Sequence, residues 1–273
     1  MKCRVDEIAA EWRTGVEKGL HELAVLCGEG HPALVEPIKY TLLGGGKRLR
    51  ALLAFAVCHD CSSQDQSAGS VRARSSAVAL EALHAASLVH DDLPALDNDD
   101  ERRGKPSCHK AFNEATAILV GDALIGAALS SVLDDETLPT DLRARVGRIL
   151  ARVWRDLCVG QQLDLASGAE RDDRLQARMV RLKTGVLFGA SASCGALCAG
   201  VRDGEISAYF EWGVRVGECF QALDDLDDGD RGESERPDIE RACRAVLQDL
   251  TALLGVSDAG ISYEVARQIL RVR

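Results

Sequence analysis

The sequence predicts an all-α fold, a single large helical bundle, and three observations support this prediction. Hydrophobic residues make up 46% of the chain and aromatic residues only 4%, a composition that favours helices over a sandwich or barrel. Most segments repeat their apolar residues at helical spacing, and no run alternates apolar and polar residues as a half-buried strand does. Because no linker interrupts the 273 residues, one domain covering 1–273 is expected.

Five helices are expected in the first half of the chain. Residues 5–27 carry an apolar stripe at three- and four-residue spacing, and the Gly- and Pro-containing stretch at 28–32 ends this helix. The polar stretch at 62–76 is predicted to form an exposed loop. The other four helices are expected where apolar residues gather, at 33–43, 49–58, 77–90 and 111–133.

The second half begins with a turn predicted at 134–140, which contains Pro139. The most apolar window, 186–201, is short and rich in Gly, Ala, Ser and Cys, which indicates a helix packed inside the protein rather than a membrane span. Residues 229–237 are charged and contain Gly and Pro. Helices are expected at 141–165, 181–199 and 206–227, followed by one or two short helices.

Charge and cysteine usage exclude several classes of function. A net charge of −10 argues against nucleic acid as the main partner, because phosphate backbones require a basic surface. The ten cysteines form no zinc pattern, since Cys58 and Cys61 make a lone CxxC. The opening residues lack the apolar core of a signal peptide, so a cytoplasmic protein with free thiols and no transmembrane segment is expected.

Two aspartate clusters carry the strongest functional signal. One begins at Asp91 and Asp92, directly after an apolar helix, and the other begins at Asp224 and ends at Asp228. Residues four apart lie on one face of a helix. Such carboxylates resist burial together unless cations lie among them. Oxygen ligands of this kind suit Mg2+, which binds one or two carboxylates together with the phosphates of a substrate.

Basic residues accompany both acidic clusters. Arg102, Arg103 and Lys105 follow the first cluster closely, and the glycines at 44–46 precede a further group of cations at 47–50. Glycine lets the backbone approach a ligand, and lysine and arginine bind anions. Cations for phosphate oxygens and carboxylates for metal ions predict a site for a metal–diphosphate complex.

At these residues the sequence resembles the trans-polyprenyl diphosphate synthases, the chain-elongation enzymes of isoprenoid biosynthesis that include farnesyl and geranylgeranyl diphosphate synthases. The resemblance covers about residues 30–230. It rests on Gly45-Gly46-Lys47-x-x-Arg50, Glu81-x-x-His84, Asp91-Asp92-x4-Asp97-x4-Arg102-Arg103-Gly104, Gly121-Asp122, Gly160-Gln161-x-x-Asp164, Lys183-Thr184-Gly185 and Gly217-x-x-Phe220-Gln221-x-x-Asp224-Asp225-Leu226-x-Asp228.

The resemblance implies an isoprenoid synthase fold around a deep central cavity, usually as a homodimer. It implies a short-chain prenyltransferase that condenses isopentenyl diphosphate with dimethylallyl, geranyl or farnesyl diphosphate, with several Mg2+ ions in each site. The implied metal ligands are Asp91, Asp92, Asp97, Asp224, Asp225 and Asp228. Arg102, Lys183 and Gln221 would bind the allylic diphosphate; Lys47, Arg50, His84 and Arg103 would bind isopentenyl diphosphate; Thr184 and Gln221 would lie near the allylic cation.

Three features depart from or refine this expectation. No lysine follows Lys183, so Arg231 and Arg236 are the expected replacements for the cations that relatives carry later in the chain. Arg48 and Lys105 are expected to be solvated surface cations. Small residues precede the first cluster at 85–87, which leaves room for a farnesyl or geranylgeranyl product. Replacing Ala86 with Phe would test whether it forms the cavity floor.

Two alternatives stay open at the level of sequence. One is a catalytically weak or regulatory subunit of a heteromeric prenyl synthase. The other is a class I terpene cyclase, which the Gly-Gly-Lys-x-x-Arg motif disfavours because a cyclase needs no isopentenyl diphosphate site. The preferred allylic primer, the product length and homomeric against heteromeric assembly do not follow from the sequence.

Overall fold

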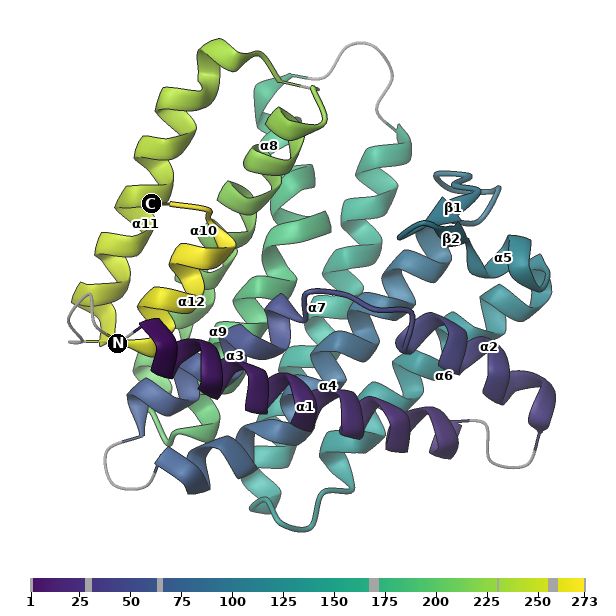
Figure 1. Ribbon diagram of the computed structural model, residues 1–273, viewed down its shortest axis with the longest axis horizontal. Coiled ribbons are helices and arrows are strands. Elements are labelled where there is room, and N and C mark those ends of the chain that lie inside the picture. Colours follow the sequence, from purple (N-terminus) through teal and green to yellow (C-terminus); the bar gives the residue numbers. More distant parts are fainter. Residues whose placement is uncertain are drawn as a thin grey trace.

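The protein is a layered bundle of α-helices, as the sequence predicts (Figure 1). The computed structural model describes residues 2–27, 31–62, 66–166, 172–229, 231–254 and 260–272. In chain order the helices are α1 (Lys2–Cys27), α2 (Pro32–Leu42), α3 (Leu49–Cys61), α4 (Gln66–Asp91), α5 (Cys108–Ala111), α6 (Glu114–Leu133), α7 (Thr140–Ala166), α8 (Asp173–Val180), the π-helical turn η1 (Arg181–Gly185), α9 (Val186–Cys198), α10 (Asp203–Asp227), the short 3-10 helix η2 (Glu233–Glu235), α11 (Arg236–Leu254) and α12 (Ile261–Ile269).

Helix α9 is the central element of the bundle. Every residue from Val186 to Cys198 is buried, and the helix packs against α3, α4, α7 and α10. Small residues predominate on it, which allows neighbouring helices to approach closely. The expectation that this apolar window lies inside the protein is confirmed. Figure 1 shows α10, α11 and α12 grouped on one side, away from α2, α5 and the hairpin.

Most expected helices are present, but the predicted loop at 62–76 is largely wrong. Helix α4 already begins at Gln66; residues 63–65 lie outside the described part of the chain. Ala73, Ser76 and Ala77 are fully buried, so the polar stretch still offers one face to the core. Arginine, alanine and glutamine favour helices, which explains why a polar sequence continues as a helix here.

Three smaller differences concern element boundaries. The expected helix at 111–133 begins only at Glu114 as α6, because the Asn113 side chain caps it by accepting a hydrogen bond from the Thr116 amide; Ala111 ends the separate short helix α5. Two-residue strands, β1 (Glu101–Arg102) and β2 (Lys105–Pro106), pair as an antiparallel hairpin where only a loop was expected. Helix α11 spans 19 residues, longer than the short helices predicted after residue 237.

Among the described helices, α6 alone is long and apolar enough to cross a membrane by length and composition. Only 33% of its most apolar window is buried. Core helices of other proteins pass the same test, so this property does not assign α6 to a membrane. It does mean that α6 presents apolar side chains outward.

Candidate active site

The first aspartate cluster lies where α4 ends and the chain reverses. Helix α4 ends at Asp91, and Pro94 lies in the turn that follows. The Asp97 amide then donates a hydrogen bond of 2.8 Å to the Asp91 carbonyl. Asn98 adopts a left-handed backbone with φ 54°, a conformation that asparagine tolerates well. The turn therefore brings Asp97 back beside Asp91.

Asp91 is the least compensated acid of this cluster. Within the described residues, its carboxylate accepts no hydrogen bond from another side chain, while it lines the central cavity. Burial raises the pKa of Asp91 to about 7; Lys183 opposes this shift, and the nearby carboxylates of Asp97 and Asp92 reinforce it. A cation placed beside this carboxylate would stabilise its charged form.

The other two acids of the first cluster are already bound to basic or amide groups. Asp92 is buried and accepts a hydrogen bond of 3.0 Å from Arg102 Nε, while Arg102 Nη2 also reaches Asp99 at 2.8 Å. Burial raises the pKa of Asp92 despite the Arg102 guanidinium. Asp97 accepts hydrogen bonds from Gln161 at 2.7 Å and Lys183 at 3.2 Å.

Lys183 and Thr184 stand on the π-helical turn η1, which packs against a glycine. A Cβ atom at Gly160 of α7 would lie 2.6 Å from the Lys183 amide nitrogen, so the two backbones touch. Single π-helical turns recur at functional sites. Here the turn aims Lys183 at the first cluster, where its ammonium group also donates to Asp164 at 2.6 Å. Thr184 instead faces α10.

Close contacts between glycines, here called the glycine seam, position the second aspartate cluster where η1 and α9 pack against α10. Gly185 and Gly189 face Gly213 and Gly217, and a Cβ atom at Gly217 would lie 2.8 Å from the Gly185 Cα atom. A Cβ atom at Gly213 would lie 2.5 Å from the Phe188 carbonyl oxygen. Side chains longer than hydrogen would push these helices apart. The seam therefore sets how close the C-terminal end of α10 lies to η1.

A chain of hydrogen bonds connects η1 to this second cluster. Thr184 Oγ1 donates to Gln221 Oε1 at 2.9 Å, and Gln221 Nε2 donates to Asp225 at 2.8 Å. Asp225 also accepts a hydrogen bond of 3.1 Å from Arg231. Asp228 is exposed at the end of α10.

Arg271, in the turn after α12, is bound to the second cluster by ion pairs with Asp224 and Asp227. Arg236, the other cation expected near this cluster, instead binds Glu233 at 2.6 Å and approaches Asp227 only to 4.0 Å. Sequence reasoning named Arg231 and Arg236 here but missed Arg271, which lies 47 residues beyond Asp224. Local spacing carries no signal for that pairing.

Arg48 is not the solvated surface cation that the sequence suggested. Its side chain is buried, pairs with Glu17 at 2.7 Å and with Glu81 at 3.7 Å, and donates to the Leu42 carbonyl at 2.7 Å. Glu81 in turn accepts a hydrogen bond of 3.1 Å from the Ala51 amide at the start of α3. These acids come from α1 and α4, so Arg48 fastens the glycine-containing loop to both helices.

Arg50 has the clearest anion-binding character in the site. Its guanidinium lies 4.7 Å from the centre of the Phe188 ring, and its buried Nε has no hydrogen-bond partner in the described structure. Burial lowers the pKa of Arg50 to about 10, so the group stays charged at neutral pH. A buried donor without a partner is uncommon and favours an anion that would complete it.

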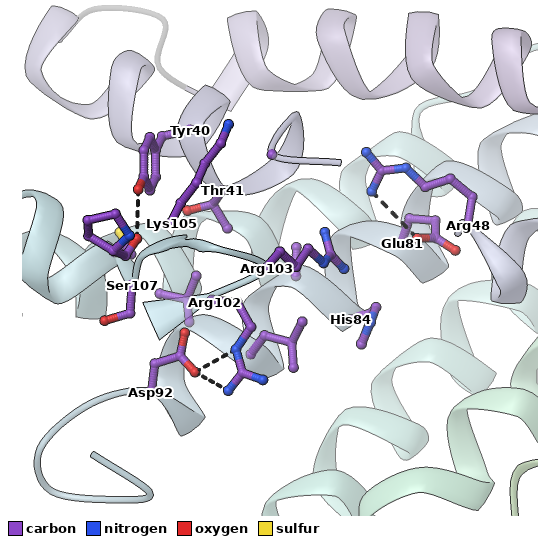
Figure 2. A pocket seen from close by; sticks show the side chains of 16 residues that line it. Tyr40, Thr41, Arg48, Glu81, His84, Asp92, Arg102, Arg103, Lys105 and Ser107 are labelled. Atoms are coloured by element: carbon purple, nitrogen blue, oxygen red, sulfur yellow. Dashed lines mark hydrogen bonds and ion pairs between the residues drawn. The ribbon is translucent and has the colours of Figure 1, made fainter. Parts of the chain in front are cut away.

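The neighbouring positive groups differ in accessibility. Lys47 is exposed at the end of the glycine-containing loop, and Arg103 donates to the Gly45 carbonyl from the β hairpin. Figure 2 shows Arg102 turned toward Asp92, whereas Arg103 lies on the side of Arg48 and Glu81. Burial, and then the charges of nearby arginines, hold the pKa of His84 well below its usual value. Its ring is therefore neutral and binds as a hydrogen-bonding group.

These side chains surround a central cavity of about 690 Å³. Of the residues predicted from the sequence, those lining it are Lys47, Arg50, His84, Asp91, Arg102, Arg103, Lys183, Thr184, Gln221 and Asp224. The remaining predicted residues, Asp92, Asp97, Asp225 and Asp228, do not line it, and Asp92 instead lines a smaller pocket beside Arg102 and Arg103 (Figure 2). The cavity is thus lined by carboxylates from both aspartate clusters, by several cations and by apolar side chains.

The residues of this cavity suit Mg2+ that binds together with an anionic substrate. In the described part of the chain, no three His, Cys, Asp or Glu side chains gather closely enough to hold an ion alone. Mg2+ commonly uses one or two carboxylates per ion and completes its shell with water and phosphate oxygens. Asp91 on one side and Asp224 on the other supply carboxylates of that kind to one cavity.

Comparison with known proteins agrees with the sequence resemblance. Residues 31–236 match the profile of the polyprenyl synthetase family. The chain is 39% identical over 209 residues to a geranylgeranyl diphosphate synthase of Rhodobacter capsulatus, covering 74% of this chain and 66% of that one. It is 38% identical over 213 residues to a farnesyl diphosphate synthase of Haemophilus influenzae, covering 75% and 70%.

The solved structures extend this similarity to nearly the whole chain. A farnesyl/geranylfarnesyl (FPP/GFPP) synthase from Zymomonas mobilis superposes with a TM-score of 0.79 at 32% identity, covering 96% of this chain and 99% of that one. A geranylgeranyl pyrophosphate synthetase from Geoglobus acetivorans superposes with a TM-score of 0.81 at 26% identity and covers 96% and 99%. The sequence matches are shorter, spanning 66% of the Rhodobacter relative and 55% of a heterodimeric synthase large subunit from Arabidopsis thaliana.

Proposed function

This chain belongs to the polyprenyl synthetase family, and on that premise we propose that it is a trans-prenyltransferase that joins isopentenyl diphosphate to an allylic diphosphate. The observation that supports this most is the central cavity, which is lined by Asp91, Asp224 and Arg50; the buried Nε of Arg50 has no hydrogen-bond partner among the described residues. A site with two carboxylate groups and a separate cation group suits two diphosphates better than one.

In this proposal the allylic diphosphate binds between the two aspartate clusters. Asp91 and Asp224, with Asp97 beside Asp91, would hold Mg2+, which would supply Lewis acidity for the departing diphosphate. Lys183 and Arg102 add positive charge. They would stabilise the diphosphate anion that forms when the carbon–oxygen bond of the allylic substrate breaks. Thr184 and Gln221 lie beside the allylic carbon, and the apolar walls exclude water that would quench the cation.

Isopentenyl diphosphate would occupy the basic side of the cavity. Arg50 and Lys47 bind its phosphate oxygens, Arg103 supports them, and neutral His84 contributes a hydrogen bond. The double bond of isopentenyl diphosphate then supplies the electron pair for the new carbon–carbon bond, and a proton leaves the adjacent carbon. In this proposal the released diphosphate accepts that proton.

The direct test combines labelled isopentenyl diphosphate, Mg2+ and each allylic diphosphate in turn, with products separated by chain length. Elongation that requires both substrates is the expected result. A hydrocarbon or alcohol formed from the allylic diphosphate alone would instead identify a terpene cyclase. Binding of both diphosphates without elongation, until a partner subunit is added, would identify a subunit of a heteromeric enzyme.

We propose that the growing prenyl chain enters a second cavity of about 220 Å³ between α4 and α7. It shares Ser87, Asp91, Leu157 and Lys183 with the central cavity, and Trp154 and Leu165 are among its other lining residues. Ala86, which the sequence analysis offered as a test position for the cavity floor, is fully buried and lines neither cavity. The room beside Ser87 supports a farnesyl or geranylgeranyl product.

Product analysis of two neighbouring substitutions tests this route. Ser87→Phe is expected to shorten the main product by at least one five-carbon unit, because its ring would fill the entrance of the second cavity. Ala86→Phe points into the core and is expected to lower stability rather than to shorten the product. Shortening by Ala86→Phe alone would contradict the assignment.

We also propose that the protein is a homodimer. Helix α6 exposes Ile118, Leu119 and Leu133, and α7, which packs against it, exposes Val159 and Leu165. Large apolar side chains gathered on neighbouring helices are typical of interfaces between subunits. A second copy of this chain is the partner that would cover both helices symmetrically. The cytoplasmic location stays a prediction.

A further inference from the structure

Arg271 occupies a turn whose backbone favours glycine. Helix α12 ends at Ile269, and the amides of Arg271 and Val272 donate to the carbonyls of Gln268 at 3.3 Å and Arg267 at 3.2 Å. This pair of hydrogen bonds is the Schellman arrangement, in which the left-handed residue is usually glycine. Arg271 adopts that conformation with φ 52°, at a cost of about 1 kcal/mol. What arginine contributes at this position therefore lies in its side chain.

The turn is fixed firmly enough to aim that side chain. Leu270 is buried in the core, and Arg267 Nη1 donates to the Val272 carbonyl at 2.8 Å. Arg267 is itself held by Glu264 at 2.8 Å and 2.6 Å. The backbone on both sides of Arg271 is thus anchored to α12 and to the core.

The Arg271 guanidinium bridges two carboxylates one turn apart on α10. Its Nη2 binds Asp224 and its Nη1 binds Asp227, while its Cζ lies 6.0 Å from the centre of the Phe220 ring. Asp224 lines the central cavity, whereas Arg271 and Asp227 line a different pocket of about 450 Å³. Arg271 therefore binds the second cluster without belonging to the lining of the central cavity.

These ion pairs are partly exposed and so are readily exchanged. The side chains of Arg271 and Asp224 are 35% and 32% exposed, and that of Asp227 is 55% exposed. Pairs of this kind contribute little free energy in water. A divalent cation offers more charge to the same carboxylate oxygen than a guanidinium does. Arg271 and a divalent cation therefore compete for Asp224.

We propose that Arg271 is the internal counter-cation of the second aspartate cluster and must leave Asp224 when a divalent cation binds there. This inference rests on the proposed function for the identity of the cation. When displaced, the guanidinium keeps Asp227, so the turn after α12 changes its contacts as the metal loads. Arg271 is a positioning residue in this scheme: it acts through Asp224 and contacts no substrate.

Direct Mn2+ titration in the presence of inorganic pyrophosphate tests the competition without turnover. Arg271→Gly removes the guanidinium and suits the left-handed backbone, so the variant is expected to fold and to bind Mn2+ about two- to fivefold more tightly. Arg241→Ala is the matched control, because it also removes one positive charge from an exposed ion pair, with Asp238, away from the cluster. An equal gain in both variants, no gain, or weaker binding by Arg271→Gly overturns the proposal.

Hydrogen exchange of the α12 turn provides a second and independent measurement. Addition of Mn2+ and pyrophosphate to the wild-type protein is expected to accelerate exchange at residues 270–272, and Asp224→Asn is expected to show the faster rate without metal. Unchanged exchange on metal loading counts against the proposal. Neither measurement requires prenyl elongation, so failure of the elongation assay and failure of this competition are separate results.

Discussion

Arg48 and Arg50 show how two arginines two residues apart differ in what they do. Arg48 is buried and balanced by Glu17 and Glu81, which makes it part of the architecture. Arg50 lies over Phe188, and its buried Nε has no hydrogen-bond partner in the described structure; Glu81 and Asp224 offset its charge only through space. A buried donor without a partner lowers stability, and an enzyme accepts this where binding requires it.

Substitution by methionine is predicted to separate the two roles. Arg50→Met should raise the KM for isopentenyl diphosphate about ten- to a hundredfold, the equivalent of about 1.5–3 kcal/mol for a charge-assisted hydrogen bond. Its free energy of unfolding should stay equal or rise. Arg48→Met should instead destabilise the fold by about 3–5 kcal/mol, because it leaves Glu81 buried without its partner. Urea denaturation and steady-state kinetics check both; equal destabilisation by the two variants would falsify the distinction.

Asp91 gives the metal-free protein a predicted pH dependence. The unfolded chain releases this proton near the ordinary aspartate pKa of 3.8, whereas the folded protein holds it until about pH 7. Stability associated with Asp91 is therefore present at acid pH and is lost as the pH rises through that window. Asp91→Asn is expected to reduce this loss of stability with rising pH and to raise the melting temperature at pH 8. Thermal melts with chelator at pH 5 and pH 8 check it; an identical slope in both proteins contradicts it.

At the scale of elements, the π-helical turn η1 depends on the absence of a side chain at Gly160. The backbones of α7 and η1 meet there, and η1 carries both Lys183 and Thr184 into the site. The position of one glycine on α7 thus controls two functional groups on another element.

Gly160→Ala is predicted to destabilise the protein by about 1–3 kcal/mol, since its Cβ atom meets backbone that has no room to move. It should also weaken turnover by displacing Lys183. Gly15→Ala on α1 is the control, because nothing lies within 4 Å of a Cβ atom there. That substitution should be neutral or stabilise by up to about 1 kcal/mol. Urea unfolding of the two variants decides, and a stable Gly160→Ala protein refutes the close contact.

The elements that sequence reasoning located well are those with regular apolar spacing, such as α1 and the end of α10. The start of α4 was missed because its polar residues resemble those of a loop. Its few core contacts are with helices distant in the sequence, so local spacing does not reveal them. Asp91, Asp224 and Arg50 could be placed in a site by motif. The roles of Arg48 and Arg271 could not, because their partners lie far away in the sequence and become neighbours only on folding.

At the scale of the whole molecule, the outward apolar side chains of α6 determine the expected assembly. Leu119→Asp should weaken the dimer at least tenfold, because the new carboxylate would be buried without a partner. Sedimentation is then expected to give the mass of one 29.3 kDa chain. Val71→Asp on α4, where the side chain is also exposed, should leave the dimer intact. Equal behaviour of the two variants would place the interface elsewhere.

The glycine seam between α9 and α10 limits which side of the cavity can change to fit other substrates. Where main chains touch, the gap from Thr184 to Asp224 stays constant as long as the glycines are kept. Substitutions elsewhere then leave this side of the cavity unchanged. Any adjustment toward longer or shorter prenyl tails is expected at the other boundary, where side chains of α4 and α7 line the second cavity.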